Sequence, residues 1–185
     1  DQSHASDAVF DDLATLLPVP FILSHSAAKA VFDHPRNLDD ARLRQLAAKG
    51  GVIQVNAYGG YLLDETPSPE RKQAEEDLEK RLGGWDGMPI EKGVELARGM
   101  AELDQRLPRR RATLDDFFVH FAHLLDVVGP DHVGIGMDWD GGGGLPGMTD
   151  VTDLPKITAW LQRRGLSDAQ IANIWSGNVL RVMRQ

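Results

Sequence analysis

The sequence has no cysteine, no long apolar run and no excess of basic residues. Without cysteine the chain forms no disulfide and offers no thiolate ligand, so a bound metal would depend on histidine and carboxylate side chains. No run approaches the ~20 apolar residues of a membrane-spanning helix, and the sequence therefore predicts no membrane span in this chain. The net charge of −8 argues against nucleic-acid binding, which needs Lys and Arg side chains to neutralise phosphates.

Short apolar segments alternate with polar loops and amphipathic helical patterns along the chain. Residues 21–23, 52–56 and 132–137 are such segments, and we expect them to form buried strands. The repeated order of strand, polar loop and helix is typical of an α/β fold with a parallel sheet. In such folds the functional loops follow the carboxyl ends of the strands.

Two short segments, residues 1–4 and 20–26, carry His4 and His25 at or near their ends. If parallel strands place these histidines side by side at one rim, their neutral imidazoles can bind a metal such as zinc. Two nitrogens do not complete a metal site, so further ligands must come from elsewhere. The polar end of the third segment, with Asp138, is where catalytic carboxylates are expected.

A set of motifs along the chain resembles the renal-type membrane dipeptidases (peptidase family M19), which are two-metal zinc peptidases built on a (β/α)8 barrel. The motifs keep the family's order and approximate spacing across almost the whole chain. The family's His-x-Asp ligand pair and bridging glutamate, which precede these motifs, have no counterpart here. The matching residues are Ser3-His4, Ser24-His25-Ser26, Arg36-Asn37, Val55 to Tyr61, Gly136 to Gly141 and Asn178 to Val182.

The resemblance implies the C-terminal part of a (β/α)8 TIM-type barrel, because a complete barrel needs about 250 residues and this chain has 185. We therefore expect residues 1–185 to belong to a single barrel domain whose N-terminal part is absent from this chain. Residues 62–111 break the strand and helix rhythm and are predicted to be an inserted helical excursion at the rim. Both a lid and a surface excursion fit this pattern.

The resemblance also implies roles for individual residues. His4 and His25 would be ligands of one of two zinc ions, and the remaining ligands would come from the absent part. Asp138 would be the general base and then the proton donor, although a strand-end aspartate that caps the next loop is the alternative. Arg36 would bind the terminal carboxylate of the substrate, and Tyr61 would line the pocket.

The function implied is zinc-dependent hydrolysis of dipeptides to free amino acids through a metal-bridging water, active only with the missing N-terminal part. The expected partners are the dipeptide and that missing part, and a homodimer is left open. Two alternatives remain at this stage. One is a catalytically inactive barrel fragment or homologue that binds metal or peptide, and the other is a related metal-dependent amidohydrolase that acts on a cyclic amide or lactone.

Local signals also predict where several helices begin. Ser6, Asn37, Thr113 and Asn178 are candidate N-caps, and residues 167–170 form a candidate capping box.

Of three further histidines, two are expected to lie on a solvated helical face, and the third, His132, is expected to be structural. In the helix after Thr113, Asp116, His120 and His123 lie opposite the apolar stripe, where a solvated face is a more frequent arrangement than a metal site. His132 begins a strand, away from the expected rim.

Overall fold

The computed structural model describes residues 1–84 and 89–185. The chain divides into two compact units, one of residues 1–64 and 112–185 and the other of residues 65–111. The larger unit contains the sheet and all of the predicted site residues. The smaller unit begins a little later than the predicted excursion, because Leu62 and Leu63 are buried in the core of the larger one.

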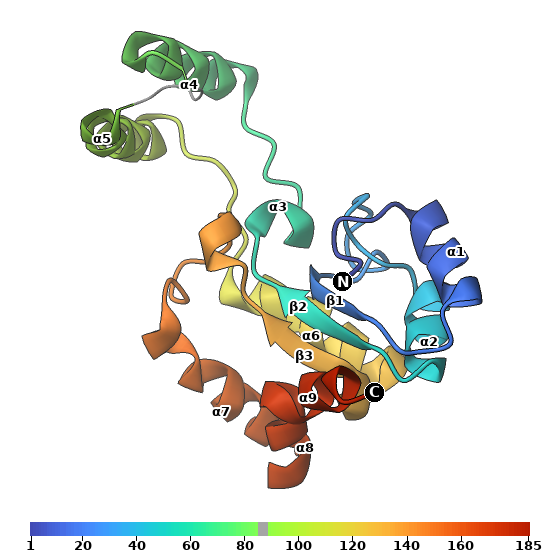
Figure 1. The fold of residues 1–185 in the computed structure, drawn as a ribbon. Helices are drawn as coiled ribbons and strands as arrows, with labels where there is room; N and C mark the ends of the chain where they lie inside the picture. The colour runs from blue at the N-terminus through green and yellow to red at the C-terminus, as the bar shows by residue number, and fades with distance from the viewer. Residues whose placement is uncertain (85–88) are drawn as a thin grey trace. The chain divides into compact units, whose positions relative to one another are not determined.

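A parallel sheet of three strands lies at the centre of the larger unit (Figure 1). The strands are β1 (Ile22–Ser26), β2 (Val52–Asn56) and β3 (Val133–Gly136), and they lie side by side in chain order. Ile53 faces Val133 in the register and Asn56 faces Gly136. The prediction of a parallel α/β sheet is therefore confirmed, although β1 extends three residues beyond the predicted segment, to Ser26, and so includes His25.

The two faces of the sheet differ because side chains alternate along each strand. Leu23, Ile53, Val55 and Val133 point into the main core, where they are almost fully buried. Ser24, Gln54, Gly134 and Gly136 occupy the alternate positions. One face is therefore an apolar packing surface, and the other begins with Ile22 and Val52 and is lined by small and polar side chains further along the strands.

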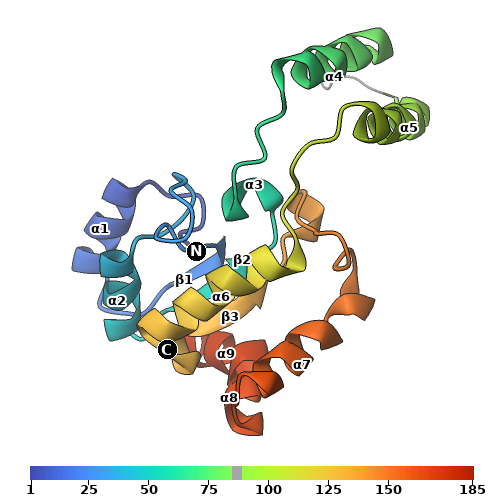
Figure 2. The same cartoon turned by 180° about the vertical axis from the view of Figure 1, so that it is seen from behind.

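Helices pack against the apolar face and around the strands of this unit. Figure 2 shows α6 (Leu114–Val128) crossing one face of the sheet, and Figure 1 looks onto the opposite face. Phe117 and Phe121 of α6 are fully buried, and burying a side chain of this size contributes about 1.5–3 kcal/mol. The other helices are α1 (Asp7–Leu16), α2 (Asp40–Ala48), α3 (Gly59–Leu62), α7 (Pro155–Arg163), α8 (Asp168–Ala172) and α9 (Asn178–Met183).

Glycine in β3 allows the strands to approach closely. A Cβ atom on Gly136 would lie 2.0 Å from the backbone oxygen of Ser24, which any larger residue would have to displace. A Cβ atom on Gly134 would lie 2.9 Å from the side chain of Gln54. These two glycines therefore leave room for the backbone of β1 and for the side chain of Gln54.

Three of the predicted helix caps are confirmed. The hydroxyl of Ser6 accepts a hydrogen bond from the backbone of Val9, and Thr113 forms a reciprocal capping box with Asp116. The capping box at residues 167–170 is also present. These signals are local, so the sequence alone was enough to find them.

The other two caps were predicted wrongly, because both asparagines bind distant backbone. Asp39, not Asn37, caps α2. Asn178 is already inside the helical stretch, and its buried amide donates to the carbonyl oxygens of Pro130 and Val133 at 2.7 and 2.8 Å. It therefore ties the start of α9 to the start of β3.

In its described residues, 65–84 and 89–111, the smaller unit contains two helices, α4 (Pro69–Leu82) and α5 (Ile90–Arg106). The helical character predicted for residues 62–111 is confirmed by both helices, although α5 was not predicted as a separate helix. Residues 85–88 of the predicted excursion lie outside the described residues. Arg71 is fully buried and donates to Glu75, Asp104 and the carbonyl oxygen of Leu107. This buried cation is compensated by two carboxylates, which is what burial of a charge requires.

The histidines of the helical face have structural contacts. His120 is fully buried, with one ring nitrogen accepting from the backbone of Ala28 at 3.1 Å and the other 2.9 Å from the carbonyl oxygen of Leu62. The Nε2 of His123 lies 2.7 Å from Asp40. His132 precedes β3, with its Nδ1 2.9 Å from the carbonyl oxygen of Gly51. A solvated face was therefore the wrong expectation for His120.

No helix within residues 1–84 and 89–185 is long and apolar enough to cross a bilayer.

Candidate metal-binding and substrate-binding site

His4 and His25 lie side by side in the larger unit, as the sequence predicted. Their Nε2 atoms are 2.8 Å apart, and the ring centroids are 4.9 Å apart in an edge-on arrangement. His25 belongs to β1, whereas His4 lies in a turn whose backbone is held to the start of β1 by a bond from Gln2 to Ile22 at 2.8 Å. Residues 1–4 therefore reach the site without forming a strand.

The electrostatic surroundings of His25 favour its neutral form. Burial is the largest effect that lowers the pKa of His25, and the nearby His4 and Arg36 lower it further. The carboxylate of Asp138 acts in the opposite direction but does not reverse the shift. A neutral imidazole has a lone pair to give to a metal, so this environment suits a ligand.

The histidine pair fits a metal of zinc's size. Two nitrogens that bind one tetrahedral ion at about 2.0–2.1 Å are separated by about 3.3 Å, so a small opening of the pair would suffice. Within the described part of the chain, no group of three His, Asp or Glu side chains is arranged to hold an ion. The two histidines would therefore supply part of a ligand set, with the rest from outside these residues.

The guanidinium of Arg36 is fixed on two sides and has one free nitrogen. Its Nε donates to the carbonyl oxygen of Ser3 at 3.0 Å, and its Nη1 donates to the hydroxyl of Tyr61 at 2.9 Å. The guanidinium carbon also lies 4.9 Å from the centroid of the Tyr61 ring. The third nitrogen, Nη2, is buried and has no hydrogen-bond partner among the described residues. It is therefore the atom that a substrate carboxylate could engage.

Asn37 positions both Arg36 and Tyr61, a role that the sequence did not reveal. Its buried amide nitrogen donates to the carbonyl oxygen of Phe32 at 3.0 Å and to that of Tyr61 at 2.7 Å. The loop that carries Arg36 is thereby joined to the short helix that carries Tyr61. The adjacency of Asn37 to Arg36 in the motif was the available signal, but it was interpreted as a helix cap.

Asp138 lies two residues beyond β3 in a conformation that is uncommon for residues other than glycine. Its backbone φ of 58° and ψ of 37° place it in the left-handed region, where aspartate is tolerated better than most residues. Its side chain makes no capping hydrogen bond to the turn that follows. A Cβ atom on Gly141 would lie 2.3 Å from Oδ1 of Asp138, so glycine at position 141 leaves room for this carboxylate.

Asp140 and Asn56 flank the site without an assigned chemical role. Asp140 is exposed in the turn after Asp138. Asn56, at the end of β2, is fully buried and accepts a hydrogen bond from the backbone of Tyr58. Its amide nitrogen has no partner among the described residues. The polar end of the sheet therefore has N–H groups, on Asn56 and Arg36, that no protein acceptor engages among the described residues.

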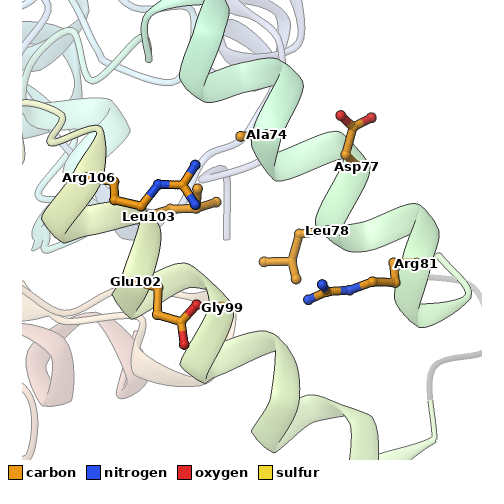
Figure 3. Close-up of a pocket in the computed structure, with 8 residues that line it drawn as sticks. All are labelled: Ala74, Asp77, Leu78, Arg81, Gly99, Glu102, Leu103 and Arg106. Carbon is orange, nitrogen blue, oxygen red and sulfur yellow. The ribbon is translucent and has the colours of Figure 1, made fainter.

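A cavity of about 330 Å³ lies in the smaller unit between α4 and α5 (Figure 3). Its charged lining consists of Asp77, Arg81, Glu102 and Arg106, two acidic and two basic side chains. None of the residues predicted from the sequence as ligands or catalytic groups lines it. We therefore place the candidate site at the histidine pair, on the strand ends of the larger unit.

The whole chain, residues 1–185, matches the family model described as membrane dipeptidase (peptidase family M19). Dipeptidase ataJ from Aspergillus terreus is 31% identical over 186 residues, which cover 100% of this chain and 35% of that protein. Dipeptidase 3 from Rattus norvegicus is 29% identical over 186 residues, covering 100% of this chain and 29% of that protein. This chain thus spans about a third of the length of these relatives.

Two solved structures are similar as well. The probable dipeptidase PvdM from Pseudomonas aeruginosa superposes with a TM-score of 0.71 at 32% identity, covering 97% of this chain and 48% of that one. A metallo peptidase from Rhodobacter sphaeroides, liganded with a phosphinate mimic of the dipeptide L-Ala-D-Ala, gives a TM-score of 0.69 at 26% identity, covering 100% and 41%. The resemblance found in the sequence motifs is confirmed, and the chain belongs to the membrane dipeptidase family, peptidase family M19.

Proposed function

We propose that residues 1–185 are the C-terminal part of a (β/α)8 metallopeptidase barrel that hydrolyses dipeptides to free amino acids. The observation that carries the proposal is the pair of facing imidazole nitrogens, 2.8 Å apart, beside an arginine with one unbonded nitrogen. The parallel order β1-β2-β3, with helices against the apolar face, is compatible with three successive strands of such a barrel.

His4 and His25 would hold one of two zinc ions, and the other ligands would come from outside this chain. When bound, a pair of metals supplies a nucleophile at neutral pH by acidifying a shared water, and it polarises the scissile carbonyl. The contribution of this chain is to present two imidazole nitrogens from a turn and a strand that are hydrogen-bonded together. Such fixed geometry is what a metal site requires of its ligands.

Arg36 selects the substrate by binding its terminal carboxylate. The bonds to Ser3 and Tyr61 fix the plane of the guanidinium and leave Nη2 for the ligand. A charged donor in a partly buried place suits a carboxylate and does not suit an amide. Arg36 would bind the carboxylate close to the histidine pair. Only a short peptide can therefore place its scissile bond at the metal while its terminal carboxylate reaches Arg36.

Asp138 is the proton-transfer group in this proposal. Its carboxylate is close enough to His25 to raise the pKa of that imidazole, although burial outweighs the effect. The same carboxylate makes no capping bond to its own turn. It is therefore suited to take a proton from the attacking water and to pass it to the departing amine.

Residues 65–111 are an insertion between β2 and β3 in this assignment. Their helices have a separate small core of Leu78, Leu82 and Leu103. The lid and the surface excursion both stay predictions for this unit.

Metal analysis of the complete enzyme tests the proposal. His4→Ala and His25→Ala should each lose about one metal equivalent together with dipeptide hydrolysis, because one site needs both ligands. His132→Ala is the matched control, since His132 binds only the backbone of Gly51 and should keep full metal content. Unchanged metal content in both site variants would overturn the assignment of the ligands. A normal metal content without dipeptide hydrolysis in the parent would instead favour a binding protein or a hydrolase of cyclic amides or lactones.

A further inference from the structure

Asp1 contacts Ser3 and Ser24, the residues that precede His4 and His25, and accepts hydrogen bonds through both of its carboxylate oxygens. Oδ1 accepts from the backbone and hydroxyl of Ser3 at 3.1 and 2.9 Å, and from the backbone of Ser24 at 3.0 Å. Oδ2 accepts from the hydroxyl of Ser24. The same hydroxyl lies 2.8 Å from Nδ1 of His25. One carboxylate thus joins the segments that carry His4 and His25.

The direction of the hydrogen bonds along this chain of groups follows from proton counting. An ionised carboxylate only accepts, so the single proton of the Ser24 hydroxyl points to Asp1. The oxygen of Ser24 is then an acceptor for His25, whose Nδ1 must carry the hydrogen. The Nε2 of His25 is therefore left with a lone pair, directed at His4.

We propose that Asp1 is a positioning residue that acts through the Ser24 hydroxyl to hold His25 as the Nδ1–H tautomer, with its Nε2 lone pair directed to the metal. This inference rests on the proposed function, since it concerns a ligand of the proposed metal site. Metal-bound histidines commonly donate their other N–H to a carboxylate, carbonyl or water, which fixes ring orientation and tautomer. Here a serine hydroxyl lies between the carboxylate and the imidazole.

The two oxygens of Asp1 have separable effects. The bonds of Oδ1 organise the backbone, because Ser3 is buried and its hydroxyl in turn accepts from the backbone of His25 at 2.9 Å. Oδ2 reaches the imidazole through the Ser24 hydroxyl. The Ser3 hydroxyl lies 3.3 Å from that of Ser24, but with both hydroxyl protons on Asp1 neither group donates across this contact. Removing the Ser24 hydroxyl therefore breaks the tautomer control while it leaves the three bonds to Oδ1 in place.

Asp1→Asn should reverse the direction of the hydrogen bonds between residue 1, Ser24 and His25, and not merely weaken them. Three donors converge on Oδ1, so an asparagine must keep its oxygen there and place its amide nitrogen opposite Ser24. The amide then donates to the Ser24 hydroxyl, which in turn donates to Nδ1 of His25. That arrangement favours a hydrogen on Nε2, the nitrogen that should bind the metal.

The test compares Asp1→Asn, Ser24→Ala and Ser24→Thr with the parent in the complete enzyme. Metal affinity is measured by competition with a chelator, and the tautomer of His25 by ¹⁵N NMR of the imidazole in metal-free protein. We expect Asp1→Asn and Ser24→Ala to lose about 10- to 100-fold in metal affinity, the usual effect of removing such a partner. Ser24→Thr keeps the hydroxyl and should retain parental affinity and the Nδ1–H tautomer.

Ser26→Ala is the matched control, because it removes a hydroxyl from the same strand that bonds the backbone of Arg36 at 2.8 Å and no imidazole. It should bind metal like the parent. Parental affinity and an unchanged tautomer in Ser24→Ala would overturn the inference, as would an equal loss of affinity in Ser24→Thr or Ser26→Ala. If His4→Ala also kept its metal, the proposed metal site itself would fail, which is a separate outcome.

Discussion

Two pairs of histidines in the larger unit have different surroundings. In the pair His4 and His25, the Nε2 nitrogens face each other across 2.8 Å. In the pair on α6, both ring nitrogens of His120 are bonded to backbone and Nε2 of His123 is bonded to Asp40. Expected positions at strand ends made the first pair candidate ligands, whereas the helical spacing of the second pair was interpreted as a solvated face more readily than as a metal site. The Nε2 nitrogens of the first pair face each other, in a contact that a metal could replace, whereas the nitrogens of the second pair bond backbone groups and a carboxylate that belong to the fold.

The same distinction extends to the other polar residues of the family motifs. The Nη2 of Arg36 is buried without a partner in the described residues, whereas Asn178 makes two bonds to backbone carbonyls. Replacing a residue with unused bonding capacity should change binding or chemistry and leave stability near normal. Replacing a residue whose bonds hold the fold should lower stability and leave the chemistry of the folded molecules unchanged.

The largest effect is expected for Asp138, whose carboxylate makes no cap to its own turn. Asp138→Asn keeps the shape but removes the proton-transfer group. We expect kcat for a dipeptide to fall by about 10²- to 10⁴-fold, with normal metal content and an unchanged melting temperature. Steady-state kinetics and metal analysis check this. Wild-type kcat in the variant would end the catalytic assignment.

Asn178 should show the opposite behaviour. Asn178→Leu is similar in size but leaves the carbonyl oxygens of Pro130 and Val133 without their donor in a buried place. We expect a loss of about 2–4 kcal/mol in the free energy of unfolding, measured by urea denaturation. The activity of the folded fraction should equal that of the parent. A large fall in kcat without loss of stability would show that this motif residue takes part in the chemistry.

The parts of the fold that depend on neighbouring residues were predictable from the sequence. The segment Val52–Asn56 coincides with β2, and the caps at Ser6 and Thr113 were recognised from local patterns. Asn37 and Asn178 also look like caps locally, but their amides bind carbonyl groups far along the chain. Helix α5 was missed, and its sequence includes Gly93 and Gly99, which weaken a helical pattern.

In the candidate site, too, the contacts between residues far apart in the chain could not be predicted from the sequence. His4 and His25 were brought together in the prediction because functional groups gather at the carboxyl ends of parallel strands, and the structure places them in contact. The bonds among Asp1, Ser24 and His25 could not be predicted, because they depend on how the turn of residues 1–4 lies against β1. The unbonded nitrogen of Arg36 likewise depends on the positions of Ser3 and Tyr61.

A smaller effect is expected when the free nitrogen of Arg36 is removed. Arg36→Met keeps much of the apolar stem but loses a charged donor to the substrate carboxylate, an interaction of about 1.5–3 kcal/mol. KM for a dipeptide should rise by about 10- to 100-fold, and the variant should lose its preference for the dipeptide over its C-terminal amide. Kinetics on both substrates measure this. A variant that discriminates against the amide as strongly as the parent would exclude Arg36 as the group that binds the substrate carboxylate.

The smallest effect concerns the pH dependence of stability at His120. Burial is the main cause that lowers the pKa of this imidazole, and the nearby His123 lowers it further, whereas the Leu62 carbonyl and Asp116 act in the opposite direction. In the unfolded chain the pKa of histidine is about 6.5. Below that pH the unfolded state takes up a proton that the folded state resists, so stability should fall as the pH decreases. The slope from this one group is at most about 1.4 kcal/mol per pH unit.

His120→Gln removes this titration and isolates its contribution. The pKa values of His25 and His34 are also lowered, but these residues are present in both proteins, so their effects cancel in the comparison. Urea denaturation at pH 7.5 and 5.5 should show a smaller loss of stability on acidification in the variant than in the parent, even if the variant is less stable at both pH values. Equal losses would mean that His120 accepts a proton in the folded protein as readily as in the unfolded chain. Burial of the imidazole would then not be what keeps it neutral in the folded protein.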